Sequence, residues 1–215
     1  MKKFVILLFV IGTVLASGWY FRGIRGNGVI VTEGRSISEF SRVRVSGGYQ
    51  IQWTQGKPGL TISTNQNLLP YIGTSISGQV LKFDAQKNLS PTKSIVVTLS
   101  SASLADVELT GANTFRAGEI TGDDLKLNST GASTITVDGS VKELTVNLTG
   151  ASALHAQSLQ VRTATITMTG ASTAVLNVTD ALKASITGAG TLTYSGNPKT
   201  VEKQVTGIGS IKHQP

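Results

Sequence analysis

In the second half of the chain, apolar and polar residues alternate on both sides of a recurring glycine. Around Gly150, for example, Val146, Leu148 and Leu154 are apolar, whereas Asn147 between the first two is polar. A period of two is typical of a strand that turns one face toward a core. Each such glycine is therefore predicted to join two strands whose apolar sides point inward.

The glycine belongs to a triplet, Thr-Gly-Ala, that occurs five times and closes as Thr206-Gly207-Ile208. Successive glycines from Gly111 onward lie 20, 19, 20, 18 and 19 residues apart. A constant step near 20 residues indicates stacked coils, and a residue without Cβ can turn a strand through a corner. We predict an all-β fold, a parallel β-solenoid with coils of about 20 residues. Its structural corner glycines are Gly47, Gly111, Gly131, Gly150, Gly170, Gly188 and Gly207.

Turn-forming residues recur about half-way between these glycines and predict a second corner in each coil. They are Gly118, Asp138-Gly139, Gln157-Ser158, Thr179-Asp180 and Ser195-Gly196-Asn197-Pro198.

The upstream half repeats less clearly. Gly47 still has Val45 before it and Ile51 after it, in the same pattern. The stretch of 64 residues from Gly47 to Gly111 would hold about three more coils. We therefore predict one array from about Val29 to Lys212 with irregular first coils, interrupted by a short helical or looped excursion at residues 67–71.

The first residues have the pattern of an export signal. Lys2 and Lys3 precede an apolar run from Phe4 to Leu15, and small residues follow. This predicts a signal peptide over residues 1–18, a linker over 19–28 and a solenoid domain over 29–215. The alternative is an uncleaved membrane anchor, because the aromatic residues at 19–21 extend the apolar run to the lower limit for spanning a bilayer.

The composition limits the kinds of partner and modification that the chain can have. Only 14% of the 215 residues are charged, and the formal charge of +7 falls to +5 without Lys2 and Lys3. The remaining cations form no run, so no nucleic-acid surface is predicted. The chain has no cysteine, which excludes disulfides, thiolate metal sites and a lipid-modified cysteine.

The candidate chemistry is sparse, and we predict no catalytic, cofactor-binding or metal-binding residues. The outward column three positions before each glycine carries Glu108 but no other acid, so no stack of carboxylates forms. His155 and His213 are too few and too far apart for a zinc site. The corner serines Ser133, Ser152 and Ser172 have no histidine–aspartate pair nearby in the repeat and are interpreted as corner packing.

Several segments follow the pattern of one known family: residues 40–47, residues 67–70, the Thr-Gly-Ala corners and the late segments 194–198 and 205–211. In these segments the sequence resembles the bacterial auto-transporter adhesin, head GIN domain. The resemblance implies a right-handed β-helix-like fold in exported bacterial proteins and implies no catalytic residues. Family members often bear a lipoprotein cysteine, which this chain lacks.

These observations favour an exported, non-enzymatic binding, adhesion or scaffold module of the bacterial cell envelope, periplasmic or at the cell surface. Envelope glycans, envelope proteins or further copies of the chain are the candidate partners, and the membrane is contacted only through residues 1–21 if they are retained. Two alternatives stay open: a polysaccharide-active β-helix enzyme, and an inner-membrane-anchored envelope protein acting in signalling or stress.

Overall fold

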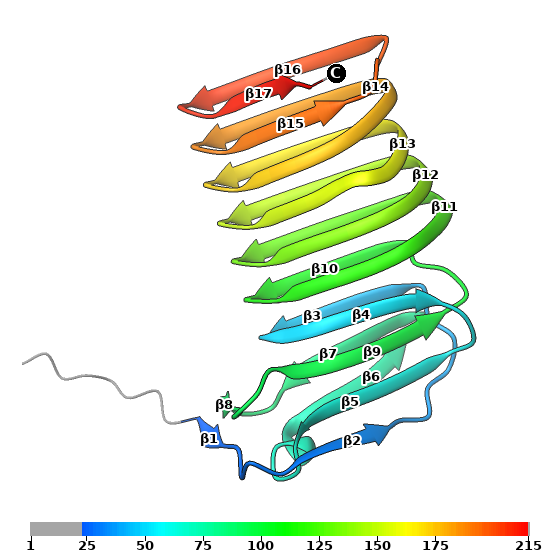
Figure 1. The fold of residues 1–215 in the computed structure, drawn as a ribbon, viewed down its shortest axis with the longest axis vertical. Coiled ribbons are helices and arrows are strands. Elements are labelled where there is room, and N and C mark those ends of the chain that lie inside the picture. Colours follow the sequence, from blue (N-terminus) through cyan, green and yellow to red (C-terminus); the bar gives the residue numbers. More distant parts are fainter. Residues whose placement is uncertain (1–22, 215) are drawn as a thin grey trace, which may run out of the picture.

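The computed structural model describes residues 23–214 and has a β-solenoid as its main body (Figure 1). In the Thr-Gly-Ala half, equivalent strands of successive coils stack on one another, and the chain reverses direction at each corner (Figure 1). The strands are β10 (Asp106–Gly111), β11 (Thr114–Gly131), β12 (Thr134–Gly150), β13 (Ala153–Gly170), β14 (Thr173–Gly188), β15 (Thr191–Ser195), β16 (Thr200–Gly207) and β17 (Ser210–His213). Each pairs in parallel with its counterpart one coil away. The predicted solenoid is confirmed.

The corner glycines stand in register from coil to coil. Gly111 pairs with Gly131, Gly131 with Gly150, and the same match continues through Gly170, Gly188 and Gly207. This register places the apolar positions flanking the glycines in continuous interior columns. Ile135, Leu148 and Leu154 are fully buried, as the alternating pattern predicts.

The second bend differs in kind from the glycine corner. Strands β11 to β14 run through it without a break, and the ladder absorbs the turn by register shifts. One shift lies between Ala117 and Ile120, and another between Thr136 and Gly139. The turn residues predicted there mark these irregularities, because bulges let a strand bend while most of its ladder hydrogen bonds persist.

The N-terminal half is arranged differently from the prediction. Its strands are β1 (Ile24–Arg25), β2 (Ile30–Gly34), β3 (Arg42–Gly47), β4 (Tyr49–Gln55), β5 (Gly59–Asn65), β6 (Ile72–Ser77), β7 (Val80–Ala85), β8 (Leu89–Ser90) and β9 (Ile95–Ser101), with a 3-10 helix η1 (Leu69–Tyr71) inside the predicted excursion. Strand β3 pairs directly with β10, so Gly47 lies beside Gly111. The expectation of about three coils between these two glycines is therefore wrong.

The intervening residues form a cap on the other side of the first coil. Strand β3 lies between β10 and β7, and β4 lies between β11 and β9. Within the cap β2–β5, β5–β9 and β6–β7 pair antiparallel. Gly78 and Gln79 both have positive φ, the backbone of a tight hairpin turn, and they reverse the chain between β6 and β7. Reversals of this kind, absent from the repeat half, end the solenoid pattern.

One apolar core runs through the cap and the coils, with Phe40, Trp53, Phe83 and Phe115 among its largest side chains. The predicted signal peptide, residues 1–18, lies outside the described residues. Strand β1, within the predicted linker, pairs with β8. Among residues 23–214, no helix has the length and apolar character needed to cross a bilayer.

Candidate functional site

The glycine corners are built by backbone geometry. The seven predicted corner glycines all have φ between 105° and 138°, a region that side chains with Cβ rarely occupy. A Cβ on Gly188 would lie 2.6 Å from the carbonyl oxygen of Gly170 one coil below. Each corner from Gly111 onward therefore needs glycine both for its conformation and for close stacking on the corner beneath.

Hydrogen bonds connect the corners into a column. From Gly111 onward, the residue after each corner glycine donates its N–H to the glycine carbonyl of the coil below, over 2.9–3.1 Å. Buried serines reinforce this column from inside: Ser133 Oγ donates to Gly111 O over 3.2 Å, and Ser172 Oγ donates to Gly150 O over 3.2 Å. The corner serines thus have a structural role, in agreement with the sequence interpretation.

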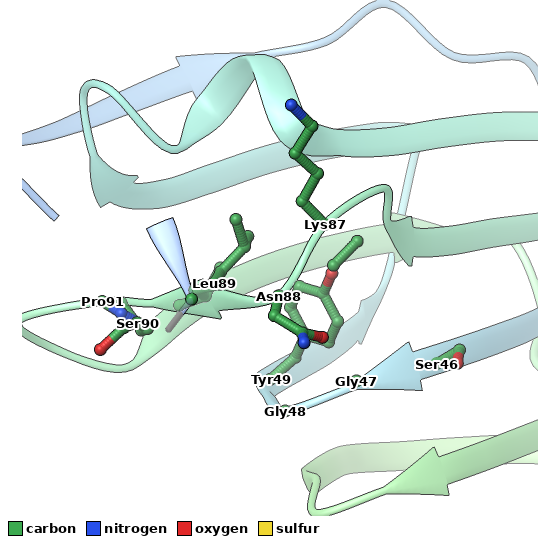
Figure 2. Close-up of a pocket in the computed structure, with 12 residues that line it drawn as sticks. Ser46, Gly47, Gly48, Tyr49, Lys87, Asn88, Leu89, Ser90 and Pro91 are labelled. Atoms are coloured by element: carbon green, nitrogen blue, oxygen red, sulfur yellow. The ribbon is translucent and has the colours of Figure 1, made fainter. Parts of the chain in front are cut away.

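The column ends at Gly47-Gly48-Tyr49, and a cavity of about 650 Å³ lies next to this lowest corner (Figure 2). Below it the chain does not form another corner. After β7 it moves outward through residues 86–94, where β8 pairs with β1. The cavity is lined by residues 46–49 on one side and 87–91 on the other, with Gly23, Ala85 and Ile95 completing it. The repeat pattern does not predict this cavity, because the cavity lies where the repeat ends.

Tyr49 forms an apolar wall of the cavity. Its side chain replaces the small corner residues of the coils above and is only 3% exposed. Its hydroxyl has no hydrogen-bond partner among the described residues. Burial raises the pKa of Tyr49 to about 12; the charge of Asp84 also raises this pKa, and Arg35 lowers it. Tyr49 is therefore a neutral phenol at physiological pH.

A second feature is a polar outer surface on the strands before the corners, which we call the threonine face. Its residues point outward from β11 to β14, stand in register and are exposed or half-exposed. They are Asn128, Thr130, Thr145, Asn147, Thr149, Thr165, Thr167, Thr169, Ser185 and Thr187. Asn147 Nδ2 donates to Asn128 Oδ1 over 2.9 Å, a side-chain contact between neighbouring coils. In the column of Thr145 and Thr165, the flanking coils carry the exposed Lys126 and Lys183, so that column has a cation at each end.

Comparison with known proteins assigns the family. A family model described as putative auto-transporter adhesin, head GIN domain, matches residues 39–198, well over half of the chain. The chain belongs to this family. The resemblance noted from the corner motifs is confirmed. A search of curated proteins finds no significant match.

Solved structures share the head GIN fold. A putative adhesin from Bacteroides fragilis NCTC 9343 superposes with a TM-score of 0.73 at 20% identity, covering 89% of this chain and 100% of that chain. A putative adhesin from Parabacteroides merdae ATCC 43184 gives a TM-score of 0.58 at 23% identity, covering 89% of this chain and 99% of that chain. At these identities the similarity concerns the fold.

The acidic residues of this head GIN domain are dispersed over the described part of the chain. Glu108 pairs with Arg44 over 2.9 Å, and Asp123 pairs with Lys142 over 2.7 Å. Asp124 and Glu143 are neighbours on adjacent coils, but they are exposed on the bend. Within residues 23–214 no three potential metal ligands gather at one place.

The two histidines of the head GIN domain lie apart. His155 is exposed on an outward column. His213 stacks on Tyr194 at a centroid distance of 4.9 Å, near the C-terminal end of the solenoid. Lys203 Nζ also lies over Tyr194, 4.9 Å from the ring centroid. In the coils below, the columns of Lys203 and His213 hold apolar residues, so two polar side chains cover the last coil.

Proposed function

We propose that this head GIN domain is an exported, non-enzymatic binding module of the bacterial envelope and that its threonine face contacts an extended envelope glycan. The family supports a surface-adhesion role, and the predicted export signal supports a location outside the cytoplasm. The observation that carries the proposal is the regular array of hydroxyl and amide groups on β11 to β14, which Lys126 and Lys183 flank in one column.

The spacing of the array suits a polymer. Neighbouring coils are about 4.8 Å apart, so the column of Thr130, Thr149, Thr169 and Thr187 repeats a hydroxyl at that interval. An extended chain of sugars could accept and donate hydrogen bonds along several coils at once, and many weak contacts along one ligand add through multivalency. The β-solenoid holds these groups in place, so few side chains must be ordered on binding.

A non-enzymatic role is part of the proposal. Acid-catalysed cleavage of a glycan needs two carboxyl groups facing one bond. On the described surface, Asp123 is engaged by Lys142, and Asp180 is engaged by both Arg162 and Lys199. The cavity beside this bend, about 310 Å³ in volume, has Lys142 and Arg162 in its wall and no carboxylate.

The test is a glycan array, followed by biolayer interferometry with purified envelope polysaccharides. We expect the double variant Thr149→Arg/Thr169→Arg to lose binding that the wild type shows. The matched control, Thr136→Arg/Thr193→Arg, places the same charges on the outward column of the strands after the corner and should bind as the wild type does. Equal loss in both variants, or cleavage of any polysaccharide by the wild type, would contradict the proposal.

A further inference from the structure

The lowest corner, at Gly47 and Gly48, has a backbone N–H in the position that forms a hydrogen bond to the coil below at every other corner. In every coil above it, the residue after the corner glycine donates its N–H to a glycine carbonyl one coil down. Gly48 holds this position in the lowest coil, and no residue among 23–214 accepts a hydrogen bond from its N–H. The reason is local: the ladder between β3 and β7 ends at the pair Ser46–Asp84, and β7 itself ends at Ala85, so the pairing stops before it reaches Gly48.

The cavity beneath Gly48 is rich in donors. Asn88 carries an amide that Figure 2 shows directed toward the glycine corner. Ser46 and Ser90 contribute hydroxyl groups, and Lys87 is the charged residue of the lining. No aspartate or glutamate lines the cavity. A ligand group that only accepts hydrogen bonds and carries negative charge matches this set of donors.

The cap limits what can enter. Strands β7, β8 and β9 continue beneath the first coil, so a second solenoid cannot stack there as one coil stacks on another (Figure 1). The opening fits a small group between Gly48 and the loop that carries Asn88. Leu89 and Pro91 add apolar surface beside it.

We propose that this corner cavity binds a carboxylate group, with one oxygen in the position that a glycine carbonyl occupies beneath every other corner. Gly48 N–H donates to that oxygen at about 2.9 Å, and Asn88 Nδ2 donates to the second oxygen. The Lys87 ammonium, which lies 5.1 Å from the centre of the Tyr71 ring, rotates on its flexible stem to neutralise the charge. The carboxylate belongs to a uronic acid of an envelope glycan, to a peptide C-terminus or to a free organic acid. The site is separate from the threonine face.

The experiment is a ¹H–¹⁵N NMR titration of the mature chain with acetate, glucuronate and N-acetylglycine, and with acetamide as an uncharged control. We expect a saturable shift of the Gly48 amide with the three acids and none with acetamide. Tighter binding of glucuronate than of acetate identifies a sugar acid, tighter binding of N-acetylglycine identifies a peptide terminus, and equal binding assigns recognition to the carboxylate alone.

Variants separate the contacts. Asn88→Ala and Lys87→Gln each remove one exposed group and should weaken binding about tenfold. The control Lys126→Gln removes an equal charge from another exposed site and should bind normally. Gly48→Pro removes the donor, whereas Gly48→Ala keeps it, and its Cβ meets only Ala112 O at 3.5 Å. The absence of a saturable shift with all three acids, or unchanged affinity in both Asn88→Ala and Lys87→Gln, would overturn the proposal even if Gly48→Pro fails to fold. Threonine-face variants should leave this binding intact, so the two proposals can fail independently.

Discussion

Replacing Gly150 with alanine measures how strongly a corner depends on glycine. The left-handed backbone at φ 106° costs a residue with Cβ about 1–3 kcal/mol. The new Cβ would also collide with the carbonyl oxygen of Gly131, which accepts the Ala151 N–H over 2.9 Å. Weakening that hydrogen bond adds about 1 kcal/mol, so we expect a loss of about 2–4 kcal/mol in the free energy of unfolding.

Thermal unfolding followed by circular dichroism provides the assay. For a chain of this size each kcal/mol moves Tm by about 2–4 °C, so Gly150→Ala should lower Tm by about 4–16 °C. Gly122→Ala is the matched control, because Gly122 lacks positive φ and a Cβ there meets nothing within 4 Å; this change should be neutral or slightly stabilising. If the two variants melt together at the wild-type temperature, the corner carries no strain and the reasoning fails.

Three other variants test neighbouring features. Ser152→Ala removes an acceptor for Ser133 N–H and a partner of Ser129 Oγ, so urea unfolding should show a loss of about 1–3 kcal/mol, whereas the exposed Thr169→Ala should change little. Lys203→Val removes one of the two polar side chains that cover the last coil and should produce concentration-dependent association in sedimentation velocity. The outward Lys212→Val should behave as the wild type; equal association of the two variants would show that Lys203 does not keep the last coil from pairing with another molecule. Because the pKa of Tyr49 rises from 10.0 to about 12 on folding, the unfolded state loses its proton first, and stability should fall as pH increases from about 10 to about 12. Tyr49→Phe, which also removes an unpartnered buried hydroxyl, should lessen this slope without loss of stability at pH 7; an unchanged slope would show that Tyr49 is not its cause.

The fold of the repeat half could be predicted because residues close together in the sequence determine each strand and each corner. Alternation around Gly131 or Gly150 identifies two strands and a corner, and a constant step then aligns each coil with the next. The N-terminal half offers no such step. Nothing near Gly47 in the sequence says that its coil has neighbours from residues 80–101 on one side and from residues 106–117 on the other.

Of the two candidate sites, one could be predicted from the sequence and the other could not. The threonine face follows from the repeat, since outward positions such as Thr149 and Thr169 can be read from the alternation. The corner cavity depends on residues 86–94 leaving the stack and on β8 pairing with β1, which are both long-range events. The turn residues Gly78 and Gln79 were the available sequence signal for a reversal between two antiparallel strands. A single hairpin turn does not show which strand of the cap pairs with the first coil of the solenoid.

The position of β3 and β4 between two later segments has a consequence for the order of folding. These strands are synthesised early, yet both flanking partners of their coil come from residues after position 79. Contacts so distant along the chain close slowly. A chain emerging from its amino end must therefore remain largely open until about residue 117 has appeared, after which each new coil can be added to a finished template. That delay is compatible with the export that we propose for this chain, because a polypeptide that has not yet closed its first coil can still be threaded through a membrane.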